Sequence, residues 1–398
     1  MIARDFPEGF LFGAATSAHQ VEGRNDGCDW VAWEAKGGAK DRSGDACDHY
    51  RLYPDDIALL RDLGLQSYRF SVEWARIEPE EGRFDAAELR HYRDMVDLCR
   101  KVGVEPIVTL HHFTLPTWLS ASGGVLAPRS AELFARYCRQ VAEALQGRVR
   151  WVVTINEPMI LVLMGYLQGV WPPGQKSPGD AVRAARRLVS WHKLAHAAIR
   201  GVDQDMLLGV AKHWIDFRPL DAAKPVHRLG SRLQHHLFNR WYLEQVKSVS
   251  DFIGINYYAR QYATSLLRQV PLATPEDPRT EMGWSIAPDG LRAALAGAAA
   301  YGLPLIVTEN GIACQQDEER IRYIDSHLAA VRQAMAGGAD VRGYQYWSLL
   351  DNFEWAEGYR PQFGLVAVDR SSQRRTVRES ARHYGEIARS GRLPGAND

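Results

Sequence analysis

Short apolar segments alternate with longer helical patterns eight times along this chain, and this alternation constrains the fold more than any other feature. The predicted strands cover residues 10–18, 67–74, 105–112, 151–156, 207–215, 252–257, 305–309 and 341–348. The helices predicted between and after them cover residues 55–63, 86–102, 130–145, 181–200, 228–246, 288–300, 318–336 and 377–388. Strands that alternate with helices form parallel sheets covered by helices, and eight such units predict closure into a (β/α)8 TIM barrel.

Length and composition are compatible with one closed barrel. The chain has 398 residues, of which 46% are hydrophobic and 24% charged, so it can bury a large core. No linker rich in Pro, Gly and Ser divides it, and closed α/β barrels reach this length as one domain. We therefore predict an α/β protein with a single barrel domain over residues 1–398, whose active site lies at the C-terminal ends of the strands.

The charge balance narrows the classes of partner. Lys plus Arg and Asp plus Glu each number 48, so the formal net charge is zero. Nucleic acids and anionic membranes are bound through basic surfaces, so neither is an expected partner. The oligomeric state is left open, and a homo-oligomer is compatible with the sequence.

The cysteines and the first residues predict a cytoplasmic protein. The five cysteines, an odd number without metal-like spacing, are Cys28, Cys47, Cys99, Cys138 and Cys314. The opening MIARDFP contains no apolar segment of the secretory type, and no run approaches the roughly 20 apolar residues of a membrane span. Reduced, mostly buried thiols in an intracellular protein are the simplest interpretation.

Polar and aromatic residues follow several predicted strands, where a buried core would not favour them. They are His111 and His112 at the end of the third strand, Asn156 and Glu157 at the fourth, Asn256, Tyr257 and Tyr258 at the sixth, Glu309 and Asn310 at the seventh, and Trp347, Glu354 and Trp355 at or beyond the eighth. Chemistry in such barrels takes place at this end of the strands. Glu157 and Glu309 each follow an apolar strand and precede a turn-forming residue, so we expect their carboxyls to converge on one pocket.

Two converging carboxyls are what glycoside hydrolysis requires. One protonates the leaving oxygen, while the other attacks the sugar or activates water. A single Glu at a strand end is more often a solvated residue or a partner of Arg, but the polar and aromatic residues at the other strand ends favour a catalytic pair. Because two carboxylates suffice, no metal or organic cofactor is expected. His192 and His196 lack the Glu of a metalloprotease motif and are interpreted as a packed pair.

At these residues the sequence resembles glycoside hydrolase family 1, the β-glucosidase family, over residues 10–368. The matching motifs are FGAATSAHQVEG at 12–23, YRFSVEW at 68–74, TINEP at 154–158, TENG at 308–311 and WSLLDNFEW at 347–355. The resemblance implies a retaining β-glycosidase that acts on small-molecule β-glycosides or short β-oligosaccharides, with terminal β-D-glucose as the default sugar.

The resemblance also implies roles for individual residues. Glu157 matches the acid/base and Glu309 the nucleophile, and Arg69 and Tyr258 match the groups that hold the nucleophile. The residues that match sugar-binding positions are Gln20, His111, Asn156, Glu354 and Trp355, with Trp347 as the aromatic platform under the sugar. Trp284 matches an aromatic wall of the leaving-group subsite, and Phe363 follows in the Gln-Phe-Gly segment at 362–364, as the family pattern expects.

Electrostatics adds expectations for the two carboxyls. Arg69 and Tyr258 should favour the ionised form of Glu309, which must be charged to attack. A negative Glu309 nearby should raise the pKa of Glu157, so that it holds a proton near neutral pH. A retaining enzyme needs the two carboxyls about 5–5.5 Å apart, and a hydrogen bond from Asn156 to the sugar 2-hydroxyl would strengthen in the transition state.

Departures from the family pattern and alternative functions remain. His112 stands where many members carry an aromatic residue, and the short chain predicts trimmed loops and a more open leaving-group cleft. β-Galactosidase or β-fucosidase activity is not separated from β-glucosidase activity. A 6-phospho-β-glycosidase is disfavoured because Glu354 would repel a 6-phosphate. A non-catalytic sugar-binding relative is disfavoured because such proteins typically lose a carboxylate, whereas Glu157 and Glu309 are both present.

Overall fold

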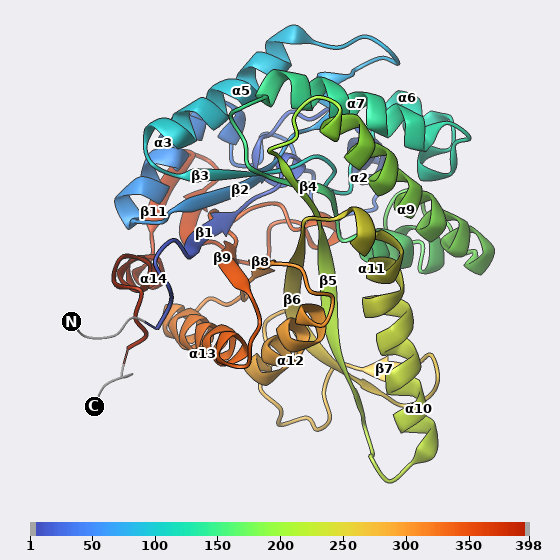
Figure 1. The fold of residues 1–398 in the computed structure, drawn as a ribbon, viewed down its shortest axis with the longest axis vertical. Coiled ribbons are helices and arrows are strands. Elements are labelled where there is room, and N and C mark those ends of the chain that lie inside the picture. Colours follow the sequence, from blue (N-terminus) through green and yellow to red (C-terminus); the bar gives the residue numbers. More distant parts are fainter. Residues whose placement is uncertain (1–4, 395–398) are drawn as a thin grey trace.

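Eight parallel strands close into a barrel in the computed structural model, which describes residues 5–394 (Figure 1). In order around the barrel they are β1 (Leu11–Ala15), β2 (Ser67–Ser71), β3 (Glu105–Thr109), β4 (Trp151–Asn156), β5 (Leu207–Pro219), β6 (Phe252–Ala263), β8 (Leu305–Asn310) and β9 (Val341–Trp347). The barrel closes where the last strand, β9, pairs with the first strand, β1, and there Trp347 lies opposite Ala15. The predicted (β/α)8 TIM barrel is confirmed.

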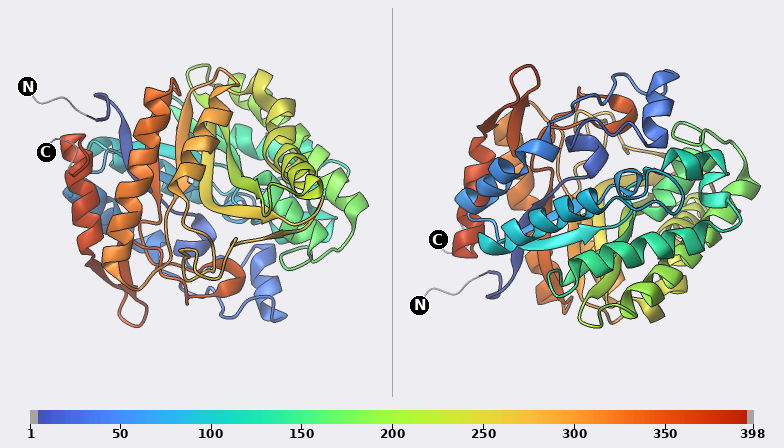
Figure 2. Two further views of the ribbon diagram at one scale, coloured as in Figure 1. Left: turned by 90° about the horizontal axis from the view of Figure 1, so that it is seen from below. Right: turned by 90° about the horizontal axis from the view of Figure 1, so that it is seen from above.

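Helices cover the outside of this barrel, as the two views in Figure 2 show. The main ones are α3 (His49–Leu63), α5 (Ala86–Lys101), α7 (Ser130–Leu145), α9 (Pro178–Arg200), α10 (Pro225–Gln234), α11 (Trp241–Val246), α12 (Pro288–Ala299), α13 (Asp317–Ala336) and α14 (Glu379–Ser390). Side-chain caps fix some starts: Asp85 accepts hydrogen bonds from the N–H groups of Ala87 and Glu88. Each predicted helix is found, although the one expected over 228–246 is divided between α10, the π-helix η3 (His235–Arg240) and α11.

The strands β5 and β6 are longer than predicted. Beyond the barrel they continue to pair with each other from Asp216 opposite Arg260 to Pro219 opposite Ala263. The short β7 (Gln269–Val270) adds to β6 in antiparallel fashion. Figure 1 shows this pair projecting away from the barrel beside α10. The extension borders the mouth of the barrel, where Gln261 and Gln269 line the pocket described below.

The interior of the barrel below the C-terminal ends of the strands is filled with apolar side chains. A buried cluster joins Ile107, Trp151, Val153, Ala211, Phe252 and Ile306 from five strands. The rings of Trp151 and Phe252 meet edge to face with centroids 5.1 Å apart. Because alternate residues of a strand point to the same face, these residues leave the inward positions near the strand ends for polar groups.

Two further expectations concern unpaired cysteines and the absence of membrane-spanning helices. All five cysteines are buried and unpaired, as predicted for reduced thiols. Between residues 5 and 394, every helix is too short or too polar to cross a lipid bilayer.

Candidate active site

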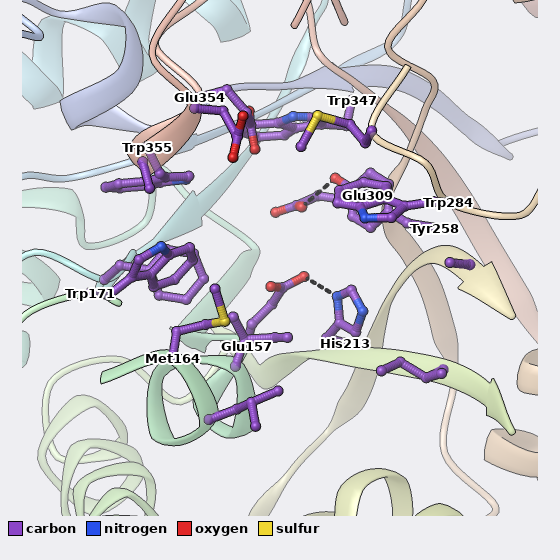
Figure 3. A pocket seen from close by; sticks show the side chains of 18 of the residues that line it. Glu157, Met164, Trp171, His213, Tyr258, Trp284, Glu309, Trp347, Glu354 and Trp355 are labelled. Carbon is purple, nitrogen blue, oxygen red and sulfur yellow. Dashed lines mark hydrogen bonds and ion pairs between the residues drawn. The ribbon is translucent and has the colours of Figure 1, made fainter. Parts of the chain in front are cut away.

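A pocket of about 490 Å³ opens at the C-terminal ends of the strands (Figure 3). Nine of the twelve predicted site residues line it: Gln20, Glu157, Tyr258, Trp284, Glu309, Trp347, Glu354, Trp355 and Phe363. Glu157 and Glu309 point into this pocket from different sides of it, as Figure 3 shows. The expected convergence of two carboxyls at the barrel mouth is therefore observed.

Glu309, near the end of β8, is held through both carboxylate oxygens. Arg69 on β2 donates from Nη1 to Oε1 at 2.6 Å, and Tyr258 on β6 donates its hydroxyl to Oε2 at 2.7 Å. The Arg69 side chain is completely buried, so its charge is not screened by water. Burial nevertheless raises the pKa of Glu309 to about 7, because loss of water outweighs the opposing effect of Arg69.

Glu157 directly follows β4 in a left-handed backbone conformation, with φ of 45°. This conformation is costly for a residue other than Gly, and here it turns the chain from β4 into the short helix α8 (Pro158–Leu161). The carboxyl oxygen Oε1 is 2.9 Å from Nδ1 of His213 and accepts from Nδ2 of Asn256 at 2.8 Å.

The prediction that the pKa of Glu157 is raised is wrong. Burial does raise it, but His213 and the hydrogen bond from Asn256, together with the charge of Lys212, lower the pKa below its ordinary value. The electrostatic prediction considered only Glu309. It missed β5, where His213 stands in register with Asn256 on β6, so that both reach the same oxygen.

A chain of hydrogen bonds connects the two carboxyls beneath the pocket. Asn156 Oδ1 accepts from Nη2 of Arg69 at 2.7 Å and from Nδ2 of Asn256 at 3.1 Å. Asn256 in turn accepts through Oδ1 from the Thr308 hydroxyl at 2.6 Å. Asn156 and Asn256 are both fully buried, so each is fixed by the groups it bonds. Arg69, which bonds Glu309, is thus joined to Glu157 through two amides.

The prediction that His111 faces the sugar is contradicted by the structure, which turns the neighbouring His112 into the pocket instead. Nε2 of His112 accepts from Nδ2 of Asn156 at 3.1 Å, and its ring lies nearly parallel to those of Trp347 and Trp355. His111 packs edge-on against Trp191 on the helix side. The physical reason is the alternation of side chains along an extended chain, which sends adjacent residues to opposite faces.

The His111 side chain is packed as an apolar residue would be. Both of its ring nitrogens are without a hydrogen-bond partner among residues 5–394, and burial lowers its pKa to about 3. The apparent departure from the family pattern, a histidine at 112 where an aromatic residue was expected, therefore has a different explanation. The histidine that belongs to the pocket is His112, and Phe113 provides the aromatic residue after it.

Glu354 lies across the pocket from Glu157, as Figure 3 shows, and Gln20 lines the same pocket beside it. Gln20 donates from Nε2 to Oε2 of Glu354 at 3.2 Å and to the Phe353 carbonyl at 2.9 Å. Burial, reinforced by the negative charge of Glu309, raises the pKa of Glu354 to about 8. A carboxyl in this state can donate as well as accept hydrogen bonds at neutral pH.

Sequence reasoning missed several pocket residues. His213, Met164 and Trp171 line the pocket, and Asn256 bonds Glu157, yet none was assigned to the site. The strand-end rule that identified the two glutamates had singled out Asn256 without giving it a role, and it could also have found His213. Trp171 and Met164 lie outside the barrel strands, in segments whose course hydrophobic periodicity does not reveal.

The metal-site alternative finds no support among residues 5–394, where no group of three His, Cys, Asp or Glu side chains is placed to bind an ion. His192 is bonded instead to the hydroxyls of Thr154 at 2.7 Å and Ser250 at 3.1 Å. Its interpretation as a packed structural residue is confirmed.

Comparison with known proteins decides the family of this barrel. The profile of glycosyl hydrolase family 1 matches residues 2–252 and 243–392. The chain belongs to glycosyl hydrolase family 1. β-Glucosidase A of Thermotoga maritima is 33% identical over 99% of this chain and all of that protein, and thermostable β-glucosidase B of Thermobispora bispora is 36% identical over 96% and 90% of the two chains.

Solved structures of family 1 members agree with the barrel. A β-glycosidase from Pyrococcus horikoshii superposes with a TM-score of 0.93 at 41% identity, covering 98% of this chain and 96% of that one. The Thermotoga maritima β-glucosidase in complex with glucoimidazole superposes with a TM-score of 0.92 at 32% identity, over 98% of this chain and all of that one. This family 1 member is a glycoside hydrolase of the β-glycosidase type.

Proposed function

We propose that this family 1 enzyme is a retaining β-glycosidase that hydrolyses terminal non-reducing β-D-glucosyl residues, and β-D-galactosyl or β-D-fucosyl residues as well. The observation that carries the proposal is the pair of buried glutamates that point into one pocket from the ends of β4 and β8. Glu309 is the nucleophile and Glu157 the acid/base. Donors to both oxygens of Glu309 suit a nucleophile, and donors to one oxygen of Glu157 suit the base of the second step.

In the first step, a Glu309 oxygen attacks the anomeric carbon. The bond from that carbon to the leaving oxygen breaks, and the leaving oxygen takes the proton of Glu157. In the second step, water attacks the same carbon and gives its proton to Glu157, while the electron pair of the ester bond returns to Glu309. The first step needs Glu309 charged and Glu157 protonated, although burial raises the pKa of Glu309 and the contacts with His213 and Asn256 lower the pKa of Glu157.

Sugar recognition is assigned to the end of the pocket opposite Glu157. Gln20 and Glu354 are the hydrogen-bonding groups for the sugar hydroxyls, and Trp347 is the platform beneath the ring. His112 takes the sugar-binding role that the sequence gave to His111. A 6-phosphate is disfavoured because no Lys or Arg lines this pocket among residues 5–394, so a phosphate would lose its water without gaining a cationic partner.

The leaving-group side of the pocket supports aryl and alkyl β-glycosides, in addition to short β-oligosaccharides, as substrates. Six apolar side chains of the lining are Ile160, Leu163, Met164, Ile215, Met282 and Trp284. Figure 3 draws Met164 directly beside Glu157, which donates its proton to the leaving group under this proposal.

Unpaired buried thiols are typical of a reducing compartment, and we place the enzyme, as a single catalytic domain, in the cytoplasm.

One experiment tests the mechanism directly. The protein is incubated with an activated 2-deoxy-2-fluoro-β-glucoside, digested, and examined by mass spectrometry for a fluorosugar attached to Glu309. Proton NMR of an ordinary β-glucoside reaction then follows the first sugar released. A β-anomer and an adduct at Glu309 support double displacement with carboxyls about 5–5.5 Å apart. An α-anomer as first product contradicts it.

A further inference from the structure

His213 contacts Glu157 in a way that restricts the chemistry of that carboxyl. Nδ1 of His213 lies 2.9 Å from Oε1 of Glu157, and both side chains are largely buried. An ionised carboxylate has no proton to donate, so Nδ1 must be the donor whenever Glu157 is charged. Asn256 donates to the same oxygen. Both contacts therefore stabilise the ionised form, and the second oxygen, Oε2, is left to face the substrate.

The orientation of the His213 ring is fixed by its neighbours. It lies nearly parallel to the ring of Tyr258, with centroids 5.9 Å apart, and meets the ring of Phe238 edge to face at 6.0 Å. The backbone carbonyl of His213 also accepts a hydrogen bond from the buried Lys212 ammonium. A ring held in this way can keep its N–H directed at Glu157 without losing much conformational entropy.

Several other ionisable groups face this pair. They are Lys212 on β5, Tyr258 on β6, Glu309 on β8 and Glu354 after β9. Glu309 is the one whose charge changes during catalysis, since it becomes an uncharged ester in the glycosyl-enzyme. In that intermediate the repulsion between the two carboxylates is gone, and His213 is the ionisable group in hydrogen-bond contact with Glu157.

We propose that His213 is a positioning residue that holds Glu157 as an ionised base in the glycosyl-enzyme, so that water attack continues at acidic pH. In this step the water oxygen bonds to the anomeric carbon, the bond from that carbon to Glu309 breaks, and the proton of water goes to Oε2 of Glu157. His213 keeps its own proton and donates to Oε1 throughout. The inference rests on the proposed function and concerns its second half.

The test uses the trapped fluoroglycosyl-enzyme, in which Glu309 is neutral and Glu157 titrates without it. The rate at which the trapped enzyme regains activity is measured from pH 4 to 8. The wild-type rate should decline only at the acidic end of this range. His213→Phe keeps the ring stacking on Tyr258 but removes the donor, and His213→Ala removes both.

Both variants should move the acidic limb upward by about one pH unit, so that reactivation becomes about tenfold slower on that limb. His213→Asn retains an N–H at a similar place and should recover at least half of this shift. His196→Asn, on α9 outside the barrel, is the control and should leave the limb unchanged. If the Phe variant does not fold, the Ala variant carries the same test.

Two outcomes are decisive and separable. If the limb of a folded donor-free variant stays within about 0.3 pH unit of the wild type, the role of His213 is disproved. A uniform loss of rate at every pH would equally contradict it, since that is the signature of a purely structural residue. If the wild type forms no covalent intermediate, the proposed function fails instead.

Discussion

The two glutamates proposed to be catalytic lie in one pocket but in unlike surroundings. Glu309 is hydrogen-bonded through both oxygens, to Arg69 and Tyr258, whereas His213 and Asn256 both contact one oxygen of Glu157. The difference matches the chemistry proposed for each. A nucleophile must be charged and fixed in direction, and donors on both oxygens favour this against the opposing effect of burial. A proton carrier must keep one oxygen accessible, and donors on the other oxygen orient it without blocking transfer.

The largest expected effect comes from removing the fully bonded carboxyl. Glu309→Gly should lower kcat by about 10⁴-fold or more, because no covalent intermediate can form, while sugar binding is retained. Steady-state kinetics and calorimetric titration with a β-glucoside check both parts. Near-wild-type turnover in this variant would remove Glu309 from the mechanism.

Glu157→Ala should distinguish substrates by their leaving groups. Natural disaccharides need protonation of the leaving oxygen and should lose about 10²- to 10⁴-fold in kcat/KM. Activated aryl glycosides leave readily without a proton and should lose much less in the first step. The measurement is kcat/KM across a series of aryl β-glucosides of graded leaving-group acidity. An equal loss for every leaving group would argue against proton donation by Glu157.

Tyr258→Phe removes one of the two donors to Glu309. A hydrogen bond to a charged group is worth about 1.5–3 kcal/mol, so kcat/KM should fall roughly tenfold to a hundredfold. The hydroxyl lowers the pKa of Glu309, and its loss should raise that pKa. Activity needs the charged nucleophile and is lost as pH falls through this pKa, so the acidic limb of kcat/KM should move to higher pH. A limb that moves to lower pH would contradict this assignment.

The smallest effects come from the adjacent histidines, which form a matched pair. His112→Phe removes the acceptor for Asn156 in the pocket and should lower kcat/KM about tenfold. His111→Phe should leave kcat/KM unchanged and raise the free energy of unfolding by about 1 kcal/mol, because it replaces two buried unpartnered nitrogens with an apolar ring. Enzyme assays and denaturant unfolding check each variant. The reverse pattern would restore the original prediction for His111.

Much of the active site was predictable because its residues follow from strand periodicity and position. Glu157, Glu309, Tyr258, Trp347 and Glu354 all lie at or beyond the C-terminal ends of the predicted strands, and each lines the predicted pocket. The error at His111 arose from the choice between two adjacent residues. Hydrophobic periodicity locates a strand end only to within a few residues, yet a shift of one residue reverses the face to which a side chain points.

The sequence by itself determined the eightfold alternation, the barrel it closes into, and the ends of the strands at which the glutamates lie. These depend on local apolar patterning, which each segment carries on its own. Only the tertiary structure decided that His112 enters the pocket, that His213 and Asn256 share one oxygen of Glu157, and that burial works against Arg69 at Glu309. The physical reason is that register between neighbouring strands and loss of water depend on contacts between segments far apart in the chain.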